Sequence, residues 1–137
     1  MNSTRPLFGT RPMYEALAER LNNDPEWLER AGHLSFSMAH VYTGVVNHTF
    51  SFRFDAGRLI DIAEHNTPVD FTLTAPAETW EQVMTRQLDA KRAVVTKQIR
   101  VEGDMLTVIK HMVVLKGLVD HLSELDVRIP SQEDAAA

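Results

Sequence analysis

Residues 97–125 read KQIRVEGDMLTVIKHMVVLKGLVDHLSEL, and this stretch decides how the rest of the chain must be arranged. Its first residues alternate between apolar and polar, so that Ile99 and Val101 face a core, as they would in a strand. Gly103 ends this strand. The carboxylate of Asp104 can accept hydrogen bonds from the free N–H groups of a following helical turn. The stretch therefore predicts a strand, a turn and one long helix that begins at Asp104.

The predicted helix has two apolar faces, and the second is rotated from the first. The first face has the spacing of a helix that covers a sheet, and it consists of Met105, Leu106, Ile109, Met112 and Val113. The second consists of Leu115, Leu118, Val119, Leu122 and Leu125. Because one straight helix cannot bury both faces on one sheet, we expect the second to pack against the N-terminal helices or a second chain, or the helix to kink at Gly117.

Residues 34–54 predict a β-hairpin. Every second residue shares one face, namely Leu34, Phe36, Met38, His40 and Tyr42, followed by His48, Phe50, Phe52 and Phe54. The apolar sets stay on one face if Tyr42 pairs with His48, His40 with Phe50, Met38 with Phe52 and Phe36 with Phe54. A shift of one residue would split them, so the sequence predicts this register.

The other elements follow from caps and turn residues. We expect helices at 13–22 and 25–30, strands at 58–64 and 69–74, a helix that opens at Pro76, and a short helix from Asp89 through Val95. With the hairpin and the strand before Gly103, these make an α/β domain with five strands. We expect residues 12–126 to form this domain, residues 1–11 to be a flexible arm and residues 127–137 a flexible tail.

Composition narrows the class of protein. The chain has 137 residues, no cysteine and a formal net charge of −5. One domain of this length can bury a core without a metal or a disulfide. The acidic charge and the lack of a basic cluster in the sequence argue against nucleic acid and against lasting attachment to an anionic membrane, while brief membrane contact stays open. With neither a secretory signal nor a membrane span, we expect a cytoplasmic protein.

Three segments carry a resemblance to a known family: FSFRFDAGRLIDI (50–62), VDFTLTAPAETWEQVM (69–84) and IRVEGDM (99–105). In this order they resemble the sterol carrier protein type 2 family of small lipid-binding domains, over roughly residues 13–122. The resemblance implies a mostly antiparallel five-stranded sheet, covered on one face by helices, with an elongated apolar tunnel between them. Such a tunnel would hold a sterol, an acyl chain or a similar lipid, and the resemblance brings no catalytic residue and no cofactor.

The candidate ligand-binding residues are the Met and aromatic side chains of the apolar faces. They are Phe36, Met38, Phe50, Phe52, Trp80, Met84, Met105, Leu106, Ile109 and Met112. Flexible, polarisable methionines suit apolar ligands of varied shape, but the same residues would form an ordinary core in most proteins. His40, Tyr42 and His48 meet at one end of this face, where they could contact a ligand headgroup or simply form a polar hairpin tip in water.

Metal and catalytic chemistry find no support in the sequence. The six histidines, His33, His40, His48, His65, His111 and His121, lack the short spacings of metal ligands. No G-x-S-x-G motif occurs, and we expect Asp61, Glu64, Glu78 and Glu81 to be solvated charges. We therefore expect no enzyme.

Two hypotheses remain from different classes of protein. The first is a carrier that shields an apolar small molecule and passes it to an acceptor enzyme or to a membrane through transient contact. The second is an interaction module, a homodimer included, that uses the Met-rich face or the stripe of Leu115, Leu118 and Leu122.

Overall fold

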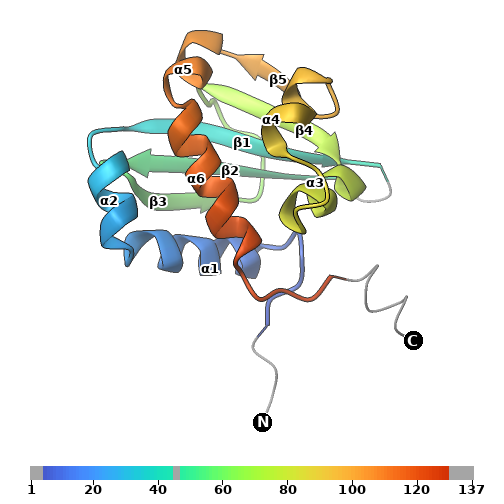
Figure 1. Cartoon of the computed structure of the whole chain (residues 1–137), viewed down its shortest axis with the longest axis horizontal. Coiled ribbons are helices and arrows are strands. Elements are labelled where there is room, and N and C mark those ends of the chain that lie inside the picture. Colours follow the sequence, from blue (N-terminus) through green and yellow to red (C-terminus); the bar gives the residue numbers. More distant parts are fainter. Residues whose placement is uncertain (1–4, 45–46, 130–137) are drawn as a thin grey trace.

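The computed structural model describes residues 5–44 and 47–129, apart from the side chain of Val113. Its elements are α1 (Arg11–Asn22), α2 (Pro25–Ala31), β1 (Phe36–Thr43), β2 (His48–Asp55), β3 (Arg58–Ala63), β4 (Phe71–Pro76), α3 (Ala77–Met84), α4 (Ala90–Val95), β5 (Arg100–Gly103), α5 (Met105–Lys110) and α6 (Met112–Ser123). Figure 1 shows the helices on one face of the sheet, with α6 crossing it.

The sheet has five strands in the order β3-β2-β1-β4-β5. All neighbours are antiparallel except β1 and β4, which are parallel. The β1–β2 register pairs Tyr42 with His48 and Phe36 with Phe54, which confirms the predicted hairpin. The predicted mostly antiparallel α/β fold is therefore confirmed.

The parallel pair requires the chain to cross from one edge of the sheet to the other half. Residues 64–70 make this crossing behind the sheet in Figure 1, on the face opposite the helices. The hydroxyl of Ser51 donates a hydrogen bond to the carbonyl of His65 at 2.8 Å. Ala39 and Ser51, which point to this face, are buried. The crossing segment thus covers part of the face opposite the helices.

A short turn at Gly103 connects β5 to α5. Gly103 has φ +115°, and a Cβ at this position would lie 2.5 Å from the carbonyl oxygen of Asp70. Only glycine fits both the backbone conformation and the close approach. The side chain of Asp104 accepts hydrogen bonds from Leu106 N at 3.1 Å and Thr107 N at 3.3 Å, which confirms the predicted cap.

The long C-terminal helix is in fact two helices. The break falls at His111, which has φ −103° and ψ 11°, and not at Gly117. Gly117 has another role, since a Cβ there would lie 3.3 Å from the ring of Trp27 on α2. Leu118 and Leu122 are buried within the chain, so the second apolar face packs against the N-terminal helices as predicted.

The first apolar face does not cover the sheet, and this prediction was wrong. Val108 is the buried residue of α5. Because α5 begins one residue after an edge strand, it lies at the margin of the sheet and only one side of it faces inward. The exposed fractions of Met105, Leu106, Ile109 and Met112 are 46%, 71%, 63% and 38%. The side chain of Val113, the fifth member of this face, lies outside the described part of the structure.

The two ends of the described chain pair with each other. Phe8 N donates to Arg128 O and Arg128 N donates to Pro6 O, each at 2.9 Å. Val127 and Ile129 are buried, each 7% exposed. Residues 5–10 and 127–129 are therefore parts of the folded unit, unlike the predicted flexible arm and tail. Residues 1–4 and 130–137 of those predicted segments lie outside the described residues.

Candidate functional site

A cavity of about 640 Å³ lies between the helix-covered face of the sheet and the surrounding helices. Its volume falls within the range of about 300 to 1,000 Å³ that is typical of small-molecule sites. Helices α3, α4 and α6 and strands β1, β4 and β5 contribute most of its wall. The apolar wall residues are Phe8, Met13, Met38, Leu73, Trp80, Val83, Met84, Leu88, Ala90, Val94, Ile99, Val101, Val108, Met112, Leu115, Leu118, Val119 and Leu122.

Only part of the predicted ligand-binding set lines this cavity. Met38, Trp80, Met84 and Met112 belong to its wall, and so do His40 and Tyr42. Phe36, Phe50 and Phe52 are buried in the core and outside the wall. Met105, Leu106 and Ile109 are on the exposed side of α5, away from the cavity. Periodicity placed all of these on apolar faces, but it could not separate core, cavity wall and surface.

Several wall residues were not predicted. Leu88, Ala90 and Val94 come from the α4 segment, whose six helical residues are too few to show a clear apolar period. Leu115 and Val119 had been assigned to helix–helix packing. Phe8 had been placed in a flexible arm, yet its ring lies edge-on to Tyr42 with centroids 5.9 Å apart. The pairing of the two chain ends brings Phe8 into the wall.

Three hydrogen-bonded polar side chains form a buried part of the wall. Tyr14 on α1 places its hydroxyl 3.0 Å from Nδ1 of His40, and the same hydroxyl is hydrogen-bonded to Tyr42. Their exposed fractions are 0%, 3% and 3%. We call Tyr14, His40 and Tyr42 the polar trio. Tyr14 was missed, although its position next to Met13 and three residues before Leu17 indicates a buried face of α1.

Burial keeps the polar trio uncharged. Removal from water lowers the pKa of His40 from 6.5 to about 3. Burial also raises the pKa of Tyr14 and of Tyr42 above the ordinary value of 10. The imidazole is therefore neutral near pH 7, with one ring nitrogen a donor and the other an acceptor.

The neutral trio retains one unused donor. If Tyr42 donates to Tyr14 and Tyr14 donates to Nδ1, then Nε2 of His40 carries a free N–H. If the direction is reversed, the hydroxyl hydrogen of Tyr42 is free instead. Within the described part of the chain no hydrogen bond fills either position. Since both residues line the cavity, either arrangement offers a donor to a neutral oxygen atom of a ligand.

The charged residues of the cavity lie at its exposed margin. They are Arg86, Asp89, Lys91, Lys116 and Asp120. Arg86 Nη1 lies 3.9 Å from Asp120 Oδ1, which is an ion pair across the margin. The cavity therefore has an apolar body, a neutral polar site in its buried wall and charges only where water reaches it.

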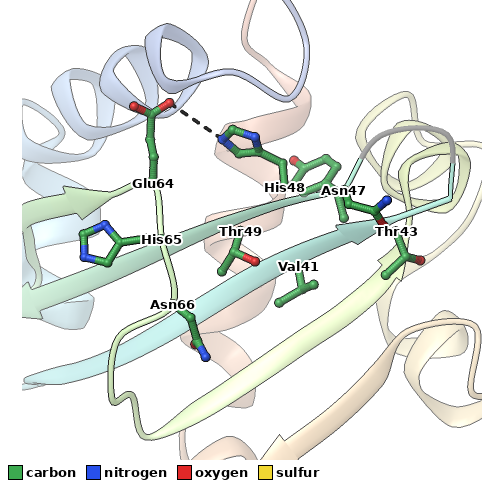
Figure 2. A pocket seen from close by; sticks show the side chains of 9 residues that line it. Val41, Thr43, Asn47, His48, Thr49, Glu64, His65 and Asn66 are labelled. Atoms are coloured by element: carbon green, nitrogen blue, oxygen red, sulfur yellow. Dashed lines mark ion pairs between the residues drawn. The ribbon is translucent and has the colours of Figure 1, made fainter.

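A second hollow of about 300 Å³ lies at the far end of the hairpin and contains His48. Figure 2 shows His48 and Glu64 pointing toward each other, with Nε2 and Oε1 3.7 Å apart. Thr43, Asn47, Thr49, His65 and Asn66 also line it. His48 therefore does not join the polar trio. In the described part of the chain, no three His, Cys, Asp or Glu side chains are grouped closely enough to hold a metal ion.

Comparison with known proteins identifies the class. Residues 15–116 match the model of the SCP-2 sterol transfer family. The chain belongs to this family, and its five-stranded mixed sheet has helices on one face with an apolar cavity beneath them. Membership supports lipid binding or transfer in general terms. Among proteins with curated descriptions, none matches the chain in sequence.

Solved structures agree in fold. A crystal structure of sterol carrier protein 2 has a TM-score of 0.76 at 17% identity, covering 85% of this chain and 97% of that one. A protein from Thermus thermophilus, described as possibly a sterol carrier protein, has a TM-score of 0.76 at 18% identity, covering 93% and 94%. At these identities the likeness concerns the fold alone.

The same fold also occurs as a small part of larger enzymes. The inverting sec-alkylsulfatase Pisa1 from Pseudomonas sp. has a TM-score of 0.54 at 18% identity, and the similar region covers 85% of this chain but 16% of that one. Fold alone therefore does not decide whether a chain takes part in catalysis. No helix in the described residues has the length and apolarity to cross a membrane. The cytoplasmic location stays a prediction.

Proposed function

We propose that this chain is a non-catalytic carrier that holds one apolar small molecule in the cavity between the sheet and α6. The observation that carries the proposal is the cavity itself, an apolar space of about 640 Å³ with three buried polar side chains in its wall. A chain with no use for this space would be more stable with larger side chains filling it, because cavities cost packing energy. A bound lipid would fill this space.

The polar trio favours a ligand whose buried end carries a neutral oxygen, such as a hydroxyl or a carbonyl. All cations of the wall lie at the exposed margin, and the trio is uncharged. A carboxylate buried beside the trio would lose its hydration without gaining a counter-charge, which is strongly unfavourable. A ligand that carries a carboxylate would instead place it at the margin, beside Arg86, Lys91 or Lys116.

Calorimetric titration with a long-chain primary alcohol and with the carboxylate of the same chain length tests this proposal. We expect the alcohol to bind with a negative heat-capacity change, because binding buries apolar surface. We expect Tyr42→Phe to weaken binding of the alcohol more than binding of the carboxylate. Extraction of the purified protein followed by mass spectrometry should recover a lipid with a neutral polar end. A protein that binds neither probe across several chain lengths, and that yields no lipid, is not a carrier.

The second hypothesis is an interaction module, and one of its two proposed surfaces, the stripe of Leu115, Leu118 and Leu122, is not available for contact with another molecule. Leu118 and Leu122 are 3% and 9% exposed, because they pack inside the chain. Of the residues that this hypothesis assigned to an interaction surface, Met105, Leu106 and Ile109 on α5 are exposed for contact with another molecule. Transfer to an acceptor enzyme stays part of the carrier proposal.

A further inference from the structure

The charges of this acidic chain are unevenly distributed. Residues 86–116 contain seven Lys and Arg against three Asp and Glu, a net charge of +4. The remaining residues contain seven Lys and Arg against sixteen Asp and Glu, a net charge of −9, two of the sixteen being outside the described residues. The total of −5 therefore hides a positive region, which is not apparent from the sequence because no run of basic residues marks it.

The Lys and Arg side chains of this positive region are all exposed. We call the seven cations the basic edge: Arg86, Lys91, Arg92, Lys97, Arg100, Lys110 and Lys116, all of which are exposed. Arg86 pairs with Asp120 and Arg100 with Glu102. In the described part of the chain, the other five have no ion pair. Figure 1 shows α4, β5 and α5, which carry most of these residues, on the side opposite the chain termini.

Exposed apolar side chains accompany the cations. Of the six large apolar residues that are exposed in the described structure, five belong to α4, α5 and the start of α6. They are Val95 at 72%, Leu106 at 71%, Ile109 at 63%, Met105 at 46% and Met112 at 38%. Large exposed apolar residues that gather on adjacent short elements usually mark an interaction site.

This surface is continuous with the margin of the cavity. Lys91 and Lys116 belong both to the basic edge and to the cavity wall, and Met112 is both exposed and part of the wall. Ala90 and Val94 of α4, and Leu88 just before it, also belong to the wall. A molecule that leaves the cavity past α4 and α6 therefore emerges beside the cations and the exposed apolar residues.

We infer that the basic edge and the apolar side of α5 dock onto an anionic lipid bilayer. Lysine and arginine gain free energy near anionic headgroups, and residues such as Leu106 and Ile109 enter the boundary between headgroups and acyl chains. A two-fold contact between copies would bring the cations of one basic edge against those of the other, which disfavours a symmetric dimer here. Continuity with an apolar cavity favours lipid over an acidic protein. Docking rests on charge and exposure alone, whereas lipid delivery rests on the proposed function.

Co-sedimentation with vesicles tests the docking. We expect binding to vesicles of phosphatidylcholine mixed with anionic phosphatidylglycerol, weaker binding to phosphatidylcholine alone, and loss of binding as salt rises. The variant Arg92→Glu, Lys97→Glu, Lys110→Glu changes no residue of the cavity wall. Each cation near an anionic surface strengthens binding about fivefold. The triple variant should therefore bind the vesicles at least about a hundredfold more weakly than the parent. Leu106→Ser with Ile109→Ser should weaken binding at every salt concentration.

Matched control variants test whether the position of the substitutions, and not only the change in charge or apolar surface, affects vesicle binding. The variant Arg30→Glu, Arg53→Glu, Arg58→Glu makes the same change in net charge at exposed positions outside the basic edge, and Ile60→Ser removes the sixth exposed apolar residue. Both should bind vesicles far better than the basic-edge variants, with circular dichroism unchanged in all. Equal loss in the control triple variant would overturn the inference, as would no binding to anionic vesicles. A doubled mass by light scattering that Leu106→Ser with Ile109→Ser abolishes would also overturn it, by assigning the surface to a second copy.

The basic-edge triple variant should bind the long-chain alcohol with the same affinity as the parent. This result would separate membrane docking from ligand binding in the cavity. If the parent binds vesicles but no alcohol, the proposed carrier function fails and the docking surface stands. If the parent binds the alcohol but not the vesicles, the docking inference fails and the carrier function stands.

Discussion

The hydroxyl of Tyr14 on α1 lies 3.0 Å from Nδ1 of His40 on β1, and both side chains are almost completely buried. This contact joins the first helix to the central strand of the sheet. It also satisfies a ring nitrogen that would otherwise be buried without a partner, which is costly. His40 stacks on Trp80 of α3 with centroids 4.6 Å apart, so one imidazole links α1, the sheet and α3. Cavity and stability thus depend on the same residues.

Acid should destabilise the protein through His40. Its pKa is about 3 in the folded state and 6.5 in the unfolded chain, so the unfolded state takes up the proton first. The free energy of unfolding should therefore fall by about 1.4 kcal/mol per pH unit as pH drops below 6.5 towards 3. Urea unfolding of the parent and of His40→Gln between pH 7 and about 4 gives the free energy of unfolding at each pH. The slope of this free energy against pH should be steeper for the parent. His33→Gln, which removes an imidazole at an exposed position, is the matched control variant. Equal slopes for the parent and His40→Gln would contradict the assignment.

Removal of the central hydroxyl of the polar trio should cost more than removal of the terminal one. Tyr14→Phe deprives both His40 and Tyr42 of their hydrogen-bond partner, whereas Tyr42→Phe deprives only Tyr14. Each buried group left unpaired costs about 1 to 3 kcal/mol, so we expect Tyr14→Phe to be the more destabilising variant. Thermal and urea unfolding at pH 7 compare the two. A larger loss in Tyr42→Phe would show that the trio is not connected through Tyr14.

Filling the cavity should weaken ligand binding more than it weakens the fold. Leu73 lies on β4 opposite His40 and belongs to the wall. A larger ring there displaces the ligand, while overpacking typically costs about 1 to 3 kcal/mol. Titration of the long-chain alcohol should therefore show weaker binding by Leu73→Trp, with a folded circular dichroism spectrum.

Ile109→Trp is the matched control for Leu73→Trp, because Ile109 is 63% exposed and outside the wall. It should bind the dissolved alcohol as the parent does. The carrier proposal would be in difficulty if Leu73→Trp bound the alcohol as well as Ile109→Trp.

A leucine-to-aspartate substitution on each of the two apolar faces of the C-terminal segment should distinguish the buried face from the exposed one. Leu118→Asp puts a carboxylate where the side chain is 3% exposed, and lost apolar burial plus the unpaired charge should destabilise the fold by at least about 3 kcal/mol. Leu106→Asp places the same charge at a position 71% exposed and should leave the melting temperature almost unchanged. Light scattering should show no dissociation in either variant, since Leu118 packs within its own chain. Equal melting temperatures would refute this assignment of faces.

Much of the fold could be predicted from residues that act locally. The alternation in residues 34–54 allowed only one register with both apolar sets on one face, and β1 and β2 pair in that register. Asp24, Asp89 and Asp104 each cap the helix that follows them, as short side chains with an acceptor oxygen commonly do. These features depend on neighbours in sequence or on a single pairing.

The cavity could be predicted only in part, for a physical reason. An apolar period shows that a face avoids water, but a dense core, a cavity wall and a docking surface satisfy the same pattern. Phe50 went to the core, Met84 to the wall and Ile109 to the surface, although all three were expected to contact ligand. Which role each residue takes depends on how far the opposite element lies, and that distance is set by the whole fold.

The sequence by itself determined the five strands, the hairpin register, the helix caps and the family, because each rests on local periodicity, hydrogen bonding or a short motif. Only the tertiary structure decided that the C-terminal helix breaks at His111, that Tyr14 meets His40, and that Phe8 belongs to the cavity wall. It also gathered scattered cations into the basic edge. These features join residues far apart in the chain, and such contacts depend on the packing of several elements at once.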